Sequence, residues 1–419
     1  MKSHISNTNE VNNGTTIFNI ELDTGKLTDT IKGGLKALCL VTGWEVMQQL
    51  FLQETEELCG PKGRHDSERT AYRHGTDQTK VIFGGEKRSV QTPRVRAKDG
   101  SGEIPLETLL FFQNEEQLTD AIFSTMINGV STRKYQRTQG GGTESKSINK
   151  SNVSEHFKKG LDKASKEFFG RRLDEEYVAV MVDGIHVGKM TVVVAMGITS
   201  DGQKSILGLV SGGTENHTVA EALFKDLIDR GLDQDCNRLY VIDGGKGLHR
   251  AIKNVFGKDA LIQRCQVHKK RNVLSHLPES EKANVGLKLS LAYMEFDYDA
   301  AKRRLMELHA ELKRNYPDAA ASLLEGLEET LTVHMLKVPG LLRKTLATTN
   351  PIESGNSVAR TISGRTRNWR DGDMILKHMA ASYLSAEESF RRVNGYKEIP
   401  DFVKNVLSYV NNITANSVA

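Results

Sequence analysis

The sequence predicts a mixed α/β protein with a central sheet, an all-helical insertion and a mostly helical N-terminal region that carries a short β-hairpin. Three patterns lead to this class. Short apolar and β-branched runs recur between Tyr177 and Arg264 and alternate with segments of helical spacing. Leucines at helical spacing fill 280–340, and a Gly-Gly turn divides two polar, basic segments near 80–96. With 419 residues, the chain is long enough for several domains with their own cores.

The N-terminal part divides into three predicted segments. They are a flexible tail over 1–26, a helix and hairpin region over 27–110, and a helical domain over 111–172. The third segment has the pattern of a helix-turn-helix domain, with helices expected over 114–128, within 129–135 and from Ser147 onward. This order predicts a DNA-binding domain that precedes the central sheet.

A DNA-binding surface is predicted on the third of these helices. Its exposed face is expected to present Lys150, Asn152 and Lys158, together with nearby serines and His156, to a major groove. Segment 133–172 contains eleven Lys and Arg against four Asp and Glu, a positive balance that suits a polyanion. The alternative is a solvated surface helix, and a solvated hairpin is likewise the alternative to a nucleic-acid-facing ribbon near 80–96.

The central part has the element order of an RNase H-like core. We expect five strands and two helices, in the order strands 177–182, 190–198 and 204–210, helix 217–230, strand 238–242, helix 246–256 and strand 260–264. The core is expected over 173–265 and 346–400, with an α-helical insertion over 266–345 between its two parts. Residues 401–419 are expected to form a C-terminal helix or tail.

Three acidic residues are candidates for a metal site. Asp183 and Asp243 each precede glycine at the predicted end of an apolar strand, and Glu353 follows a typical helix start with Asn350 as cap and Pro351 in the first turn. Their hard oxygen donors suit Mg²⁺ or Mn²⁺, and two ions are expected because that arrangement suits phosphodiester chemistry. Taken singly, an Asp-Gly pair is more typical of a turn, and Glu353 of a first-turn helix residue.

Other candidate residues lie beside these carboxylates in the sequence. Arg360 follows Glu353 by about two helical turns and shares its helix face. Cys265 is expected to pack and His268 to contact the site, because a zinc site would need a second ligand pair. DNA contacts are predicted for His268, Lys269, Lys270, Arg271, Arg360, Arg365, Arg367, Trp369 and Arg370. The alternatives are a solvated helix start for the run of basic residues and a core position for the tryptophan.

Composition excludes several other classes of protein. The net charge is only +4, so the positive charge is local. The four cysteines form no Cys-x-x-Cys pair, which is typical of a protein in a reducing cytoplasm. We expect no membrane association, because no apolar stretch has the length of a span or of a signal peptide core. We also expect no nucleotide cofactor, because the glycine-rich stretches lack the P-loop pattern.

Four segments taken together resemble the Mutator-like transposases of bacterial insertion sequences. These are Val182-Asp183-Gly184 and the runs Val241–Leu248, Arg264–Asn272 and Thr348–Asn356. The hairpin segment 92–96 and the segment 129–133 are similar to N-terminal signatures of that family, so the resemblance covers roughly 60–390. It implies an Asp-Asp-Glu transposase whose metal-binding triad is Asp183, Asp243 and Glu353, with Cys265 and His268 as the Cys-x-x-His signature that follows the second aspartate.

This resemblance also implies a function and its partners. Such a protein would bind the terminal inverted repeats of its element as double-stranded DNA, cut the ends with Mg²⁺ and join the 3′-hydroxyl ends to target DNA. A homodimer on paired ends is expected, acting at the nucleoid in a bacterial cytoplasm. The rival functions are an RNase H-like nuclease without strand transfer and a catalytically inactive, domesticated DNA-binding regulator.

Overall fold

The computed structural model describes 35–64, 67–135, 149–212, 217–364, 366 and 369–418, and it confirms the mixed α/β class. The chain forms two compact units, Met1–Gly160 and Leu161–Ala419. The predicted tail over 1–26 lies outside the described residues, and the finer domain boundaries stay predictions. No helix in the described part of the chain has the length and apolarity needed to cross a membrane.

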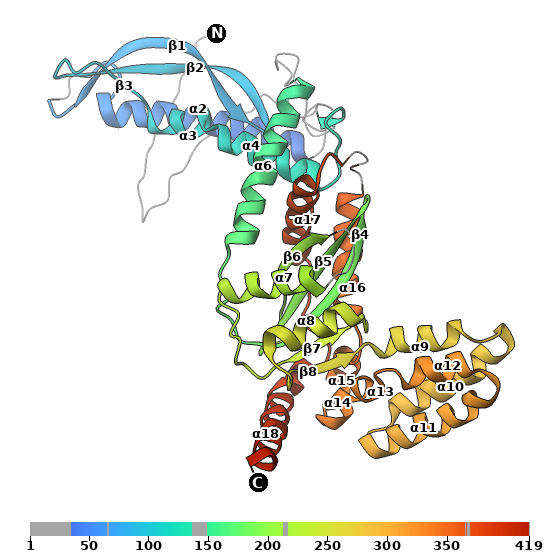
Figure 1. Ribbon diagram of the computed structural model, residues 1–419. Coiled ribbons are helices and arrows are strands. Elements are labelled where there is room, and N and C mark those ends of the chain that lie inside the picture. Colours follow the sequence, from blue (N-terminus) through green and yellow to red (C-terminus); the bar gives the residue numbers. More distant parts are fainter. Residues whose placement is uncertain are drawn as a thin grey trace. The chain divides into compact units, whose positions relative to one another are not determined.

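The first unit combines a long hairpin with helices. Its elements are α2 (Leu35–Cys59), β1 (Ala71–Phe83), β2 (Glu86–Ala97), β3 (Glu103–Ile104), α3 (Glu107–Gln113), α4 (Glu115–Ile127) and the start of α6 (Lys150–Gly170). Figure 1 shows β1 and β2 curving over α2. Met47 and Phe51 of α2 are buried in one cluster with Val81, Val90 and Val95 of the strands, so the apolar face of the hairpin packs on this helix.

The predicted hairpin and the first and third helices of this unit are confirmed, whereas only the start of the predicted second helix lies among the described residues. The hairpin turns at Gly84 and Gly85, whose φ angles of 62° and 81° suit the twist of a two-residue turn. The chain leaves α4 through Gly129 with φ 105°, and a helical turn begins before Tyr135, whose N–H donates to the Ser131 carbonyl at 3.0 Å. The segment 136–148 lies outside the described residues.

The second unit is built on a mixed five-stranded sheet. The strands are β4 (Tyr177–Val187), β5 (Met190–Thr199), β6 (Lys204–Gly212), β7 (Leu239–Ile242) and β8 (Leu261–Arg264), in the spatial order β6-β5-β4-β7-β8. Neighbours among β6, β5 and β4 are antiparallel, whereas β4, β7 and β8 run parallel. The connecting helices are α7 (His217–Asp229) and α8 (Lys246–Phe256), so the predicted order of five strands and two helices is confirmed.

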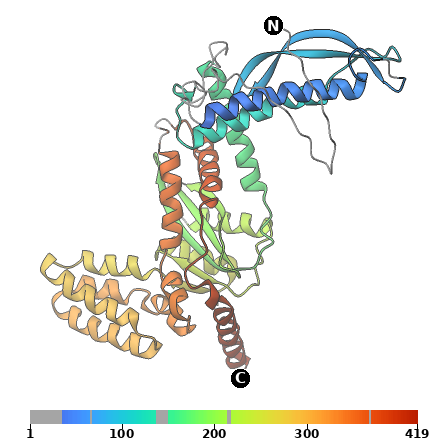
Figure 2. The same cartoon turned by 180° about the vertical axis from the view of Figure 1, so that it is seen from behind.

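Helices cover both faces of this sheet. Val180 and Val182 of β4 pack against α7 and α8, while Ala179 and Met181 point to the opposite face, as the two-residue period of a strand requires. That second face is covered by α16 (Asn350–Ser363), α17 (Gly372–Glu387) and the start of α18 (Ile399–Val418), which follows the short η1 (Tyr396–Glu398). The two opposite views show α7 and α8 on one side and α16 and α17 on the other (Figures 1 and 2).

The predicted helical insertion is present between β8 and α16. It comprises α9 (Gln266–Ser275), α10 (Glu279–Met294), α11 (Tyr298–Asn315), α12 (Pro317–Leu324), α13 (Leu327–Thr330), α14 (Thr332–Met335) and α15 (Gly340–Leu346). Gln263 of β8 fastens the returning chain, since its Nε2 donates to the Thr330 carbonyl and its Oε1 accepts from Val333 N–H, both at 2.9 Å. Gln266 N–H donates to the Ala347 carbonyl at 2.9 Å, so α16 begins beside the start of α9.

Candidate active site

The strand register makes Asp183 and Asp243 neighbours. Strands β4 and β7 are parallel, and Val182 is paired with Ile242, so each aspartate is the next residue along its chain. The prediction that both strands end there is right for β7 and wrong for β4, which continues to Val187. Its antiparallel partner β5 stays paired as far as Met190, so Asp183 keeps one strand neighbour after β7 has ended.

A tight turn holds Asp243 after β7. Gly244 has φ 108°, a backbone conformation that residues with a Cβ adopt only at a cost. The turn brings Gly245 N–H to 2.9 Å from Asp243 Oδ1, to which it donates a hydrogen bond. One carboxylate oxygen is therefore oriented by the backbone, as in the turn that is typical of an Asp-Gly pair taken singly.

Glu353 lies in the first turn of α16, as predicted, and two neighbours orient it. The helix cap is Thr349 rather than Asn350, which is the first helical residue. The buried Thr349 hydroxyl donates to Glu353 Oε1 at 2.7 Å. His268 from α9 lies beside both, with Nδ1 3.3 Å from the Thr349 hydroxyl and Nε2 3.8 Å from Glu353 Oε1. The expected approach of His268 to the carboxylate site is therefore present in the structure.

Two buried residues that the sequence did not single out hold Asp183. Asn356 donates from Nδ2 to Asp183 Oδ2 at 2.8 Å, and Tyr383 of α17 donates to Asn356 Oδ1 at 2.6 Å. Asn356 is 2% exposed and Tyr383 is fully buried, so both ends of the amide are satisfied inside the protein. Asn356 follows Glu353 by three residues and therefore shares its helix face, a spacing that predicts its inward position. No sequence pattern indicates Tyr383.

The electrostatics of Asp183 favour the binding of a cation. Burial and, after it, the charges of the Asp243 and Glu353 carboxylates together raise the pKa of Asp183 to about 6. The chemical type of the donors fits Mg²⁺ or Mn²⁺, since all three candidate ligands are hard carboxylates. In the described part of the chain, no three His, Cys, Asp or Glu side chains are grouped closely enough to hold an ion as they stand. Ion binding would therefore require the carboxylates to move closer together.

The buried Cys265 and the half-buried His268 form a pair beside Glu353. Thr349 N–H donates to Cys265 Sγ at 3.4 Å, so the thiol is packed and hydrogen-bonded, as predicted for a packing residue. Burial alone would raise the pKa of the Cys265 thiol, but hydrogen bonds to His268 and Thr349 lower it below its usual value. The hydrogen bond to Cys265 raises the pKa of His268 despite burial, and the nearby carboxylates act in the same direction. The imidazole is thereby biased toward its charged form next to Glu353.

The basic run after His268 divides between the protein interior and the surface. Lys269 is 5% exposed and its Nζ donates to the carbonyls of Ser322 and Glu325, at 2.7 and 2.6 Å. The predicted DNA contact of Lys269 is wrong, because this lysine is buried and instead donates to backbone carbonyls near the end of α12. Lys270 is half-buried and donates to the Ser290 hydroxyl at 2.6 Å, whereas Arg271 is exposed.

The remaining basic candidates after Glu353 differ in exposure. Arg360 is exposed on α16, and Arg370 is exposed before α17, while Arg365 and Arg367 lie outside the described residues. Trp369 is half-buried against the core, and its ring meets the His378 ring edge-to-face at a centroid distance of 5.2 Å. This packing supports the core alternative for the tryptophan, and its stacking on DNA stays a prediction.

Three of the α6 residues predicted to face DNA are exposed, whereas one histidine is not. Lys150, Asn152 and Lys158 of α6 are exposed, and Asn149 caps the helix start by accepting Asn152 N–H at 2.8 Å. The expectation that His156 shares this exposed face is wrong. His156 is 7% exposed, and its Nδ1 lies 2.9 Å from the Thr119 hydroxyl, because the apolar side of α6 packs on α4.

Comparison with known proteins identifies the family. Residues 21–392 match the family described as "Transposase, Mutator family", so the chain belongs to the Mutator family of transposases. This confirms the resemblance and the predicted function as a transposase.

Curated relatives cover most of the chain. It is 29% identical over 370 residues to the transposase for insertion sequence element ISRM5 of Rhizobium meliloti strain 1021, covering 85% of this chain and 89% of that relative. It is 27% identical over 320 residues to the transposase for IS256 in transposon Tn4001 of Staphylococcus aureus, covering 74% and 79%. A further relative, the transposase for ISRM3 of Rhizobium meliloti strain 1021, is 28% identical over 332 residues.

Proposed function

We propose that this chain is an Asp-Asp-Glu transposase of a bacterial insertion sequence, with an RNase H-like catalytic core. It binds the terminal inverted repeats of its element, cuts a strand at each end in a reaction that depends on divalent metal, and transfers the freed 3′-hydroxyl to target DNA. The relatives named as transposases of insertion sequence elements support the substrate. Because two ends must be joined, the proposed active form is a homodimer on double-stranded DNA at the nucleoid.

The observation that carries this proposal is the pairing of Val182 with Ile242, which makes Asp183 and Asp243 neighbours at the edge of the sheet. The raised pKa of Asp183 supports it, since the charges of Asp243 and Glu353 act on this group together with burial. A protein without metal or acid–base chemistry gains nothing from three carboxylates in this position, because their mutual repulsion costs free energy.

The residues around the carboxylates have distinct proposed tasks. Asp183, Asp243 and Glu353 would hold two divalent cations, which when bound activate the attacking oxygen and stabilise the leaving one. Asn356 and Thr349 orient Asp183 and Glu353 through the hydrogen bonds at 2.8 and 2.7 Å. His268, biased toward its charged form, is placed to contact a phosphate that approaches Glu353.

The DNA contacts divide between the two units. In the first unit, the exposed Lys150, Asn152 and Lys158 support a role of α6 in binding the inverted repeats. In the second unit, the exposed Arg271, Arg360 and Arg370 are the proposed phosphate contacts near the carboxylates. This division predicts that changes in α6 weaken recognition of the ends, whereas changes in the carboxylates leave binding intact.

The proposal is tested with duplex DNA that carries an end of the element. The wild-type chain is incubated with Mg²⁺, and nicked and joined products are separated for the wild type and for Asp183→Asn and Glu353→Gln. Nicking at one position with strand transfer, lost in both variants while DNA binding persists, is the expected result. Nicking without joined products would favour a nuclease, and binding without metal-dependent nicking would favour a regulator.

A further inference from the structure

A pocket lined by basic residues lies in the second unit beside the first turn of α16. The volume of the pocket is about 470 Å³. Its lining comes from the start of β6, from α15, from the turn into α16 and from the segment that follows α17. Four lining residues are cationic and none is acidic, so the pocket is positively charged; the cations are Lys204, Lys344, Arg391 and Arg392.

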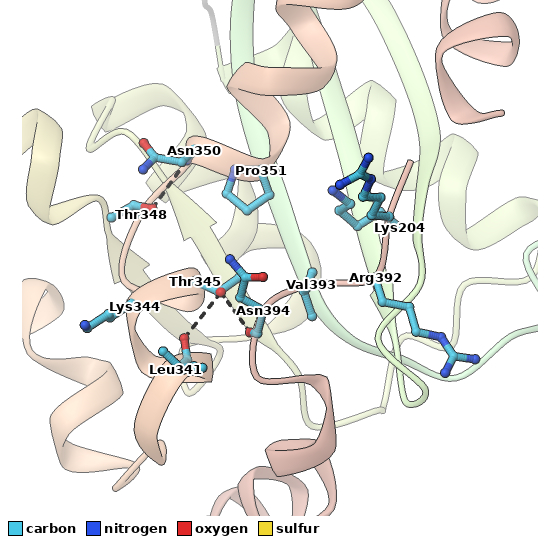
Figure 3. Close-up of a pocket in the computed structure, with 11 residues that line it drawn as sticks. Lys204, Leu341, Lys344, Thr345, Thr348, Asn350, Pro351, Arg392, Val393 and Asn394 are labelled. Carbon is cyan, nitrogen blue, oxygen red and sulfur yellow. Dashed lines mark hydrogen bonds between the residues drawn. The ribbon is translucent and has the colours of Figure 1, made fainter. Parts of the chain in front are cut away.

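The cations stand on opposite sides of this pocket. Figure 3 shows Lys344 on one side and Lys204 with Arg392 on the other, with Asn350, Pro351 and Val393 between them. A ligand seated between the two walls would therefore meet positive charge from both sides. This arrangement suits an extended anion better than a single small one, because the charges are spread along the walls.

Most of the positive charge in this pocket is not neutralised by the protein. Arg392 pairs with Asp201 at 3.1 Å, and both side chains are about half exposed. Lys344 and Arg391 are exposed and form no ion pair with any residue that the structure describes. Lys204 is half-buried, with its Nζ 5.3 Å from the centre of the Phe390 ring, and burial lowers its pKa. An anion in the pocket would offset the cost of holding this half-buried charge.

The pocket adjoins the residues that carry the third carboxylate. Thr348 and Asn350 line it, and Thr349 between them donates its hydroxyl hydrogen to Glu353. Asn350 precedes Glu353 by three residues, which is about one helical turn or roughly 5 Å along the axis. Neighbouring nucleotides in a strand rise by about 3.4 Å, so a strand passing Glu353 reaches the pocket within a few nucleotides.

We propose that this pocket binds the sugar-phosphate backbone of the DNA strand that continues beyond the cleaved phosphodiester. Lysine, arginine, threonine and asparagine side chains are the usual partners of phosphate oxygens, and they make up most of the lining. No aromatic side chain lines the pocket, so it offers no platform for stacking a base and its contacts are independent of sequence. The pocket thus positions the strand and does not read it. This inference rests on the proposed function.

The test compares two double variants of the full chain. Lys344→Ala with Arg391→Ala removes two exposed, unpaired cations of the pocket. Lys313→Ala with Arg314→Ala, at exposed positions of α11, removes the same charge elsewhere in the unit and is the matched control. The affinity for a labelled duplex carrying an element end and its flanking DNA is measured over a series of salt concentrations. Melting temperatures verify that both variants stay folded.

We expect the slope of log affinity against log salt to fall by about two in the pocket variant, since each lost phosphate contact removes about 0.9. The control variant should keep the wild-type slope, and Lys344→Arg with Arg391→Lys should restore it. Equal slopes for the wild type and the pocket variant would overturn the proposal, as would an equal loss in the control. A pocket that binds only free inorganic phosphate would also leave the slopes equal. If the wild type binds this duplex but never cuts it, the proposed function fails. The slopes of log affinity against log salt still test whether the pocket binds the DNA backbone.

Discussion

Asn356 donates a hydrogen bond of 2.8 Å to Asp183, although the two residues lie 173 positions apart in the chain. The bond joins α16, which carries Glu353, to β4, which carries the first aspartate. Tyr383 completes the chain of hydrogen bonds from α17. The helix and the strand are thereby fixed to each other where two of the proposed metal ligands meet, so this buried amide sets the geometry of the site.

Replacing Asn356 by alanine is expected to impair metal binding more than folding. The change leaves the Tyr383 hydroxyl and Asp183 Oδ2 without partners, which costs about 1–3 kcal/mol of stability. Loss of a residue that orients a ligand typically lowers metal affinity roughly 10- to 100-fold. Calorimetric titration with Mn²⁺ in the absence of DNA measures this directly. Ser354→Ala, at an exposed position of the same helix, is the control, and Mn²⁺ affinity equal to wild type in Asn356→Ala would contradict the positioning role.

Asp183→Asn is expected to stabilise the metal-free protein at neutral pH. The folded-state pKa of about 6 lies above the usual 3.8, so the contribution of this group is fully present below pH 3.8 and is lost as the pH rises through about 6. This gap corresponds to roughly 3 kcal/mol at most. Asparagine stays neutral at every pH and can still accept from Asn356. In urea unfolding with a chelator, the variant should exceed the wild type near pH 7, and the difference should vanish near pH 4.

The same urea unfolding experiment is repeated with Mg²⁺ for the wild type and for Asp183→Asn. The cation should raise the unfolding free energy of the wild type at neutral pH, because it binds the folded state and offsets the repulsion among the carboxylates. The variant should gain less from it. A wild type that is more stable than Asp183→Asn at neutral pH without metal would show that the buried carboxylate is not unfavourable in the folded state.

The Thr349 hydroxyl is expected to matter through Glu353. Thr349→Val keeps the shape of the side chain but removes the donor to Glu353 Oε1, whereas Thr349→Ser keeps it. We expect strand cleavage to fall about tenfold or more in the valine variant and to stay near wild type in the serine variant, since a carboxylate freed from its partner is less well oriented. The Mg²⁺ concentration at half-maximal cleavage should rise in parallel. Equal cleavage by the valine and serine variants would refute this role.

Alanine substitutions of Lys269 and Arg271, two basic residues of α9, should have opposite effects on stability and on DNA binding. Lys269→Ala leaves the carbonyls of Ser322 and Glu325 without their donor, so we expect a loss of about 1–3 kcal/mol in unfolding free energy. Arg271→Ala, at an exposed position, should leave stability within about 0.5 kcal/mol of wild type and weaken DNA binding. Urea unfolding and a binding titration of both variants separate the two roles. The reverse pattern would show that Lys269 faces DNA.

The sequence predicts the elements of the sheet well because their patterns are local. The apolar runs ending near Asp183 and Asp243, and the Asn350-Pro351 helix start, are all recognisable within a few residues. The continuation of β4 to Val187 could not be predicted in this way. It depends on pairing with β5 across a hairpin, whereas the Asp-Gly pair by itself indicates a turn.

The candidate site was predictable only for residues whose chemical type marks them. Carboxylates after apolar strands indicate a metal site. The spacing of Asn356 after Glu353 indicates only a shared helix face, and its hydrogen bond to Asp183 depends on a tertiary contact that no local pattern contains. The same limit explains Lys269 and His156, whose polar side chains suggest exposure although packing of their helices buries them. Charge and polarity predict which residues can take part, and the fold decides which of them face the site.

The central claim is that the carboxylates brought together by β4, β7 and α16 carry out strand cleavage. The most direct measurement is cleavage and joining of labelled element-end DNA with Mg²⁺ by the wild type and by Asp243→Asn, which preserves shape and can still accept from Gly245 N–H. The account predicts nicking and joined products for the wild type, and DNA binding without either for the variant. Cleavage by Asp243→Asn at a rate near that of the wild type would contradict it.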